Sequence, residues 1–159
     1  TAFVEAGLHI ANGLIVLAIF QGSGSLMSGL VFWALAQVLL LVAGRLYEGV
    51  TPHNVHTELE RDNAAVGLAF CGVLIGFGNI ISVAVAGDFI GWKEGMQAFL
   101  IEALFGLAVL LLIKKITVLL LASGVSLSDE QTEEKPNLGA GLVEALGYIG
   151  GSMLVIWVL

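Results

Sequence analysis

Five long apolar runs alternate with short polar segments along this chain of 159 residues. The runs cover roughly 2–20, 27–47, 64–86, 96–121 and 138–159. Each is close to the ~20 residues that a helix needs to cross about 30 Å of hydrocarbon. The runs are continuously apolar and lack the alternating pattern of barrel strands. The pattern predicts an all-α, polytopic membrane protein with five transmembrane helices.

The segments between the runs are of two kinds. Segments 21–25 and 87–95 are short turns, whereas 48–62 and 122–136 are longer, charged linkers. Five of the six basic residues lie on the linker side, namely Arg45, Arg61, Lys114, Lys115 and Lys135, and only Lys93 lies on the other. Because cytoplasmic loops carry an excess of Lys and Arg, both linkers are predicted to be cytoplasmic.

The runs are copies of one another. Residues 1–10 (TAFVEAGLHI) match 140–149 (AGLVEALGYI) with a glutamate at the same place, and 66–76 form a weaker copy. This repetition predicts a single membrane domain of two-helix units: 1–20 as the second half of one unit, 21–86 as the second unit and 87–159 as the third. The chain starts inside a unit and without Met, so we expect a further helix before it and six spans in the parent protein.

Composition supports a membrane protein. Hydrophobic residues make up 58% of the chain and charged residues 12%, with a mean hydropathy of +0.99, which leaves too few polar groups to cover a soluble globule. The net charge of −7 lies mostly in the linkers and argues against a basic, lipid-binding surface, and we expect no nucleic-acid partner. The single cysteine, Cys71, permits no disulfide framework.

The linkers repeat as well. Each returns to the membrane through an asparagine, Asn63 or Asn137, which is predicted to cap the next helix. Thr51-Pro52 predicts a short surface helix over 52–61. The many acids of both linkers are interpreted as a solvated face.

The linker sequence resembles that of a known family. Thr51-Pro52, then Asn63-Ala64-Ala65, then the glycines from Gly72 to Gly76 are similar to the repeat unit of the YjfL-like proteins of the bacterial inner membrane, a family of unknown function. The resemblance implies a multi-pass protein of the inner (plasma) membrane and no particular reaction. The third unit departs from it, with Ser126-Leu127 and Asn137-Leu138-Gly139 at the matching places.

Polar residues inside the apolar runs are the candidate functional residues: Glu5, His9, Asn12, Glu102 and Glu144. An ionised acid at the bilayer centre costs at least ~2.5 kcal/mol, so such residues normally face protein or water. Glu5, His9 and Asn12 are spaced i, i+4, i+7 and share one helix face. Such a column suits a hydrogen-bonded helix interface, a proton or cation path, or a metal or haem ligand; we expect no bound cofactor, because haem on His9 would need a second ligand from elsewhere.

Two further groups of residues are candidates. Small residues predict close helix packing, and the positions are Gly72, Gly76, Gly147, Gly150 and Gly151. His53, His56 and Glu60 are a weak metal candidate at i, i+3 and i+7 of the expected linker helix.

The sequence contains no catalytic set or phosphate loop, so we expect no enzyme. The leading interpretation is a structural or accessory subunit that assembles as a homo-oligomer or within a larger membrane complex, with Glu5 and Glu144 at equivalent interfaces. The alternative is a small channel or transporter for protons or cations, lined by the intramembrane acids. Replacing Glu5 or Glu144 by Gln separates the two, because an amide preserves hydrogen bonding but not ion conduction.

Overall fold

The computed structural model describes residues 2–121 and 124–158, and these residues form helices and no strand. The helices are α1 (Ala2–Gln21), α2 (Leu26–Val50), α3 (Val55–Glu60), α4 (Ala64–Val85), α5 (Trp92–Leu121), α6 (Leu127–Thr132) and α7 (Leu138–Ile156). Five of them are long and apolar enough to span a membrane. The all-α fold with five spans is therefore confirmed.

Helix α5 differs most from its predicted bounds. It begins at Trp92 rather than at 96, directly after Gly91, whose φ of +145° ends the preceding turn. At 1.5 Å per residue its 30 residues extend for about 45 Å, which exceeds the ~30 Å hydrocarbon layer. A helix of this length carries residues beyond the hydrocarbon.

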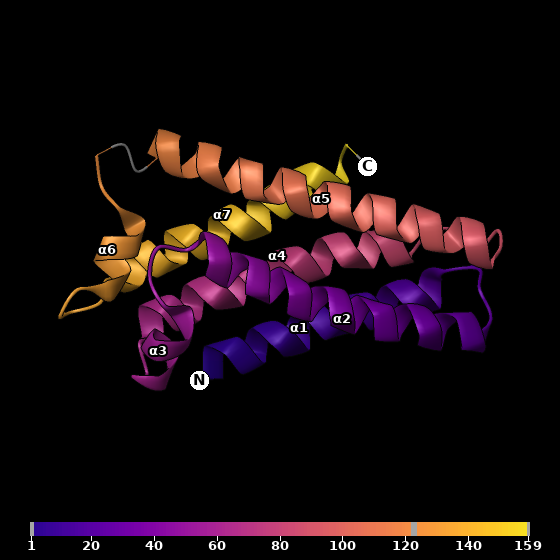
Figure 1. The fold of residues 1–159 in the computed structure, drawn as a ribbon, viewed down its shortest axis with the longest axis horizontal. Helices are drawn as coiled ribbons and strands as arrows, with labels where there is room; N and C mark the ends of the chain where they lie inside the picture. Colours follow the sequence, from indigo (N-terminus) through magenta and orange to yellow (C-terminus); the bar gives the residue numbers. More distant parts are fainter. Residues whose placement is uncertain (1, 122–123, 159) are drawn as a thin grey trace.

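The long helices form an elongated bundle (Figure 1). The short turns between α1 and α2 and between α4 and α5 lie at the right-hand end of Figure 1, and α3 and α6 lie at the left-hand end. We call these the turn end and the linker end. As a result α1, α4 and α7 run parallel, and α2 and α5 run in the opposite direction.

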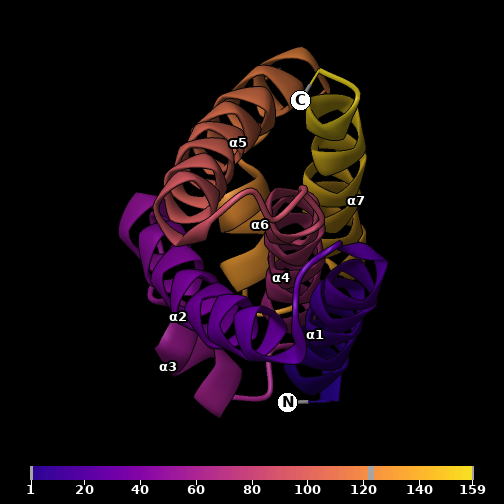
Figure 2. The ribbon, with the colours of Figure 1, turned by 90° about the vertical axis from the view of Figure 1, so that its right-hand side faces the viewer.

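Helix α4 occupies the centre of the bundle. In Figure 2, which looks along the bundle, it is surrounded by the other four long helices. The most apolar window of α4 is 67% buried, against 22% to 44% for the other spans. The other four helices therefore present much of their apolar surface outward, as expected where lipid is the solvent.

Glycines set the spacing between α4 and its two parallel neighbours. A Cβ added to Gly7 of α1 would lie 2.9 Å from the Cα of Cys71, and a Cβ added to Gly72 would clash with the backbone of Ala145 in α7. A Cβ on Gly76 would lie 2.8 Å from the carbonyl oxygen of Tyr148. Only glycine lets the backbones approach this closely, which is how small residues hold membrane helices together.

The linkers form a second repeated feature. Helix α3 begins at Val55 with Asn54 as its N-cap, so it is shorter than the predicted 52–61, and α6 is a matching helix in the third unit. The caps predicted for the next spans are confirmed: the Oδ1 atoms of Asn63 and Asn137 accept backbone N–H groups of α4 and α7. Each asparagine also donates to a linker acid at 2.8 Å, Glu58 or Glu130. These two acids therefore stabilise the caps instead of belonging only to a solvated face.

Candidate functional site

A buried ion pair joins α5 to α7 near the linker end. Lys114 Nζ lies 2.9 Å from Glu144 Oε1, with side chains 19% and 4% exposed. Burying two charges costs solvation free energy, and a buried ion pair offsets this cost only when further hydrogen bonds satisfy the remaining polar atoms. The surroundings of Glu144 supply such bonds.

Side chains from four helices converge on this pair. Gln131 of α6 donates from Nε2 to Glu144 Oε2 at 2.7 Å, and the Tyr47 hydroxyl of α2 donates to Oε1 at 3.4 Å. Lys114 Nζ also lies 5.7 Å and 5.8 Å from the ring centroids of Tyr47 and Tyr148. The carboxylate therefore ties α2, α5, α6 and α7 together.

Gln131 connects this cluster to the second unit, residues 21–86. Its backbone oxygen accepts a 2.8 Å hydrogen bond from Asn63, the residue that caps α4. The Gln131 side chain is fully buried, and its Oε1 has no hydrogen-bond partner among the described residues. The Tyr148 hydroxyl is in the same situation. The linker thus contributes a buried polar residue to the bundle.

His53 lies beside the cluster, between α2 and α3. Its Nδ1 is 2.6 Å from the Ser128 hydroxyl, while its Nε2 is buried without a partner among the described residues. Burial lowers the pKa of His53 from its ordinary value of 6.5, although Glu144 and Glu58 act in the opposite direction. The imidazole is therefore neutral at neutral pH, with one N–H to donate.

A cavity of about 520 Å³ opens next to these residues. It is lined by Val50, Thr51, Pro52, His53, Ala108, Leu111, Leu112, Lys114, Lys115, Val118, Ser126, Leu127, Ser128 and Glu144. Helices α2 and α5 meet at the turn end, where the ring centroids of Phe32 and Phe99 are 5.4 Å apart, and the cavity lies at their linker ends. Its size is that of a small-molecule pocket.

The second unit has apolar residues at the positions that correspond to Glu144 and Gln131. Phe70 aligns with Glu144, and Leu59 is the fifth residue of α3 as Gln131 is of α6. Tyr47 stacks on Phe70 with ring centroids 5.5 Å apart. The polar cluster is therefore a feature of the third unit and not of the repeat.

The column predicted in α1 is divided. Asn12 accepts hydrogen bonds from Trp33 Nε1 and Gln37 Nε2 of α2, at 3.0 Å and 3.1 Å. Glu5 and His9 are exposed and form no hydrogen bond or ion pair with the described residues. The structure thus places Glu5 and Glu144 in different surroundings.

Glu102 is remote from both glutamates. It is partly buried in α5 and lines a cavity of about 60 Å³ at the turn end, together with Ser25, Ser28 and Asp88. Glu102 and Glu144 therefore line separate cavities at opposite ends of the bundle.

The remaining predicted residues take different places. Gly151 packs on Leu110 and Ile113 of α5, Gly147 is partly buried, and Gly150 faces open space. Within the described residues no three potential ligands gather around a metal position. Helix α3 starts after His53, which binds Ser128, while His56 pairs with Glu60 at 3.2 Å.

Sequence reasoning missed Lys114, Gln131 and Tyr47. In the sequence, Lys114 is informative only about topology, and Gln131 belongs to a linker whose acids predict a solvated face. The available signal was that Lys114 lies inside a continuous apolar run, where an unpaired charge is costly and a partner is expected.

The five apolar helices and the buried ion pair define a polytopic helical membrane protein. Residues 21–159 match the model of the family described as Domain of Unknown Function (DUF350), and the chain belongs to that family. Searches of the curated proteins and of the solved structures found no match.

Proposed function

We propose that this protein is a structural or accessory membrane subunit that self-associates through the outward surface of α1. This surface consists of Ala2, Ala6, His9 and Gly13, and we call it the outer face of α1. Each of the four residues is exposed. The observation that carries the proposal is that the matching residues of both other copies are buried in helix contacts.

The correspondence follows from the repeat. Counted from the aligned residues Glu5, Phe70 and Glu144, the outer face of α1 corresponds to Gly67, Cys71, Leu74 and Gly78 in α4 and to Gly141, Ala145, Tyr148 and Ser152 in α7. All eight of these residues are buried. In α4, Cys71 and Gly78 pack against α1, and in α7, Ala145 and Tyr148 pack against α4. In α4 and α7 this face thus packs on the preceding copy, whereas in α1 it is left uncovered by the described residues.

Helices α1, α4 and α7 form a row, and the outward surface of α7 at the other end of this row differs from that of α1. The outward residues of α7 that match Gly7 and Gly72 include Leu146, which is 57% exposed. A leucine at the point of closest approach prevents the tight contact that the two glycines allow. The proposed association therefore involves two α1 helices and not α1 with α7.

Symmetry and polarity both favour a second copy of this chain as the partner that covers the outer face of α1. A two-fold axis along the membrane normal pairs two α1 helices in parallel, as α1 is paired with α4, and contacts of this kind are the commonest among homo-oligomers. Pairing would also remove the His9 imidazole from lipid, where a polar group without a partner is costly. Glu5 lies one turn from the helix start and near the headgroups, at the edge of this contact.

Two glycines allow a matched test. A Cβ on Gly13 and a Cβ on Gly150 both meet open space within the chain, so Gly13→Leu and Gly150→Leu should fold equally well. Gly13→Leu is expected to convert the detergent-solubilised protein to monomer, and Gly150→Leu to leave the dimer intact, as measured by light scattering on a gel-filtration column. A wild-type monomer would contradict self-association, and co-purification of another protein that Gly13→Leu releases would identify a different partner.

The finer family resemblance, to the YjfL-like inner-membrane proteins with both linkers in the cytoplasm, is kept as part of the proposal. It rests on the Thr51-Pro52 and Asn63-Ala64-Ala65 motifs and on the five linker-side basic residues. Labelling of single cysteines placed in each linker of intact cells tests the orientation. Labelling by a membrane-impermeant reagent would contradict it.

The transport alternative requires the intramembrane acids to share a hydrated path. It is less favoured because Glu144 is held by Lys114, Gln131 and Tyr47, and because Glu102 belongs to another cavity. The test is cation or proton flux into vesicles that contain the purified protein. Flux that Glu144→Gln abolishes would revive this alternative and overturn the scaffold interpretation.

A further inference from the structure

We propose that the cavity at the linker end binds the phosphate-bearing headgroup and upper acyl chain of an anionic phospholipid. This proposal is independent of self-association, because the cavity lies between α2, α5 and α6 and not on α1. It rests on the charge of the lining, the unpartnered imidazole nitrogen and the division of the lining into a polar part near the linker end and an apolar part further along α5.

The lining is positive although the chain is acidic. The cavity is lined by Lys114 and Lys115 and by one acid, Glu144, so two positive charges less one negative leave one positive. The whole chain carries −7. Lys114 is engaged by Glu144, whereas Lys115 is exposed and forms no ion pair with the described residues. A lysine at the linker end attracts an anionic headgroup, so the proposal departs from the expectation, drawn from composition, that the protein lacks a basic lipid-binding surface.

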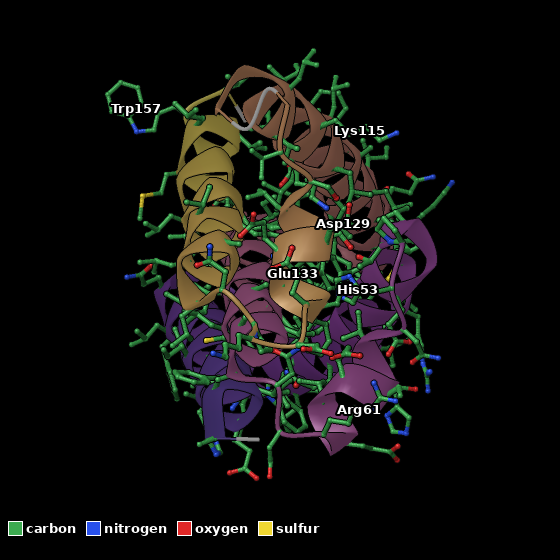
Figure 3. All side chains as sticks on the ribbon, turned by 90° about the vertical axis from the view of Figure 1, so that its left-hand side faces the viewer. His53, Arg61, Lys115, Asp129, Glu133 and Trp157 are labelled. Atoms are coloured by element: carbon green, nitrogen blue, oxygen red, sulfur yellow. The ribbon has the colours of Figure 1, made fainter. Side chains whose placement is uncertain are left out.

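Neutral donors line the same cavity as the lysine. Ser128 and His53 share a hydrogen bond, and if the serine hydroxyl donates to Nδ1, the imidazole keeps its proton on the buried Nε2. That buried N–H has no acceptor among the described residues, and His53 is one of the residues that line the cavity. Figure 3, which looks at the linker end, places Lys115 and His53 on the same side of α6. An N–H and an ammonium group together suit a phosphate oxygen.

The lining that α5 contributes is apolar on the turn-end side of the lysines. Ala108, Leu111 and Leu112 of α5 line the cavity further from the linker end than Lys115 does. Ala108 and Leu112 are exposed, so this apolar lining continues onto the surface that faces lipid. An acyl chain placed there would start at the headgroup and follow α5 into the bilayer. This division favours a phospholipid over free phosphate.

The test is thermal unfolding of the full chain in a non-ionic detergent with three additives: phosphatidylglycerol, phosphatidylcholine and inorganic phosphate. Phosphatidylglycerol is expected to raise the Tm in a saturable manner, because a ligand that binds only the folded state stabilises it. Phosphatidylcholine should raise it less, and phosphate alone should leave it unchanged. An equal rise with phosphatidylcholine would overturn the selectivity for anions, and an equal rise with phosphate would overturn the assignment to lipid.

Two variants of the same helix locate the site. Lys115→Gln should weaken the apparent affinity for phosphatidylglycerol about fivefold, in line with the usual contribution of one lysine near an anionic surface. Lys93→Gln removes the same charge from the turn end of α5 and is the control. Equal weakening by both variants would mean that only overall charge matters and would overturn the site. His53→Ala should weaken binding as well, and unchanged affinity in that variant would exclude the imidazole from the site.

Discussion

Helices α1 and α7 are copies of one repeat, yet their glutamates have opposite surroundings. Glu144 is 5% exposed and bonds to Lys114, Gln131 and Tyr47, whereas the exposed Glu5 side chain forms no hydrogen bond or ion pair with the described residues. The helices themselves are not the cause, since each packs on α4 through small residues. The difference comes from α5 and α6, which supply the partners of Glu144 in α7, whereas no described helix or linker supplies such partners to Glu5. An intramembrane acid therefore gains its role from the neighbouring helix and linker and not from its own helix.

The largest expected effect comes from removing the buried acid. Glu144→Ala leaves Lys114 without a partner and should lower the free energy of unfolding by about 3–5 kcal/mol, whereas Glu5→Ala should change it by less than about 0.5 kcal/mol. Thermal and denaturant unfolding in detergent measures both. The pair Lys114→Met with Glu144→Leu should recover most of the loss, and equal effects at Glu5 and Glu144 would contradict the comparison.

The next largest effect concerns the glycines of the parallel helices α4 and α7. Gly72→Ala places a methyl group against the backbone of α7 and should destabilise the protein by about 1–3 kcal/mol. Gly150→Ala fills open space and should be neutral or slightly stabilising, because alanine favours a helix over glycine. Thermal unfolding of the two variants measures both changes in stability. Destabilisation by Gly150→Ala would mean that the outer side of α7 is also a packed surface.

A smaller effect tests the linker. Gln131→Ala removes the 2.7 Å hydrogen bond to Glu144 and should cost about 1–2 kcal/mol. Thr132→Ala, one residue later in α6, is the control, because the Thr132 hydroxyl bonds only to backbone oxygens of its own helix. Equal losses in the two variants would show that α6 contributes through its helical structure alone.

The smallest effect depends on pH. The folded protein lowers the pKa of His53 by burying it, so it disfavours the protonated imidazole. The stability contributed by this group is complete above the ordinary pKa of 6.5 and is lost as the pH falls through that value toward the folded-state pKa. His53→Gln should flatten the decline in Tm between about pH 7.5 and pH 5, and His56→Gln should not. A decline that persists in His53→Gln would assign it to another group.

The sequence predicted much of the fold because long apolar runs and asparagine caps are local signals. The five spans and the caps at Asn63 and Asn137 depend on residues close together in the chain. The site depends instead on Tyr47, Lys114 and Gln131, which lie up to 97 residues from Glu144 and approach it only in the folded bundle. The sequence repeat was informative about which residues correspond and misleading about their surroundings, because exposure depends on what covers each copy.

The most direct test of the central claim is disulfide cross-linking at one repeat position. Ala6 and Ala145 correspond, but Ala145 is covered by Gly72 of α4 and Ala6 is exposed. In a Cys71→Ala background, Ala6→Cys is expected to form a disulfide-linked dimer on oxidation in native membranes, because paired α1 helices bring the two cysteines within bonding distance. Gly150→Cys, equally exposed on α7, should remain monomeric. Cross-linking of both variants to the same extent, or of neither, would contradict the account.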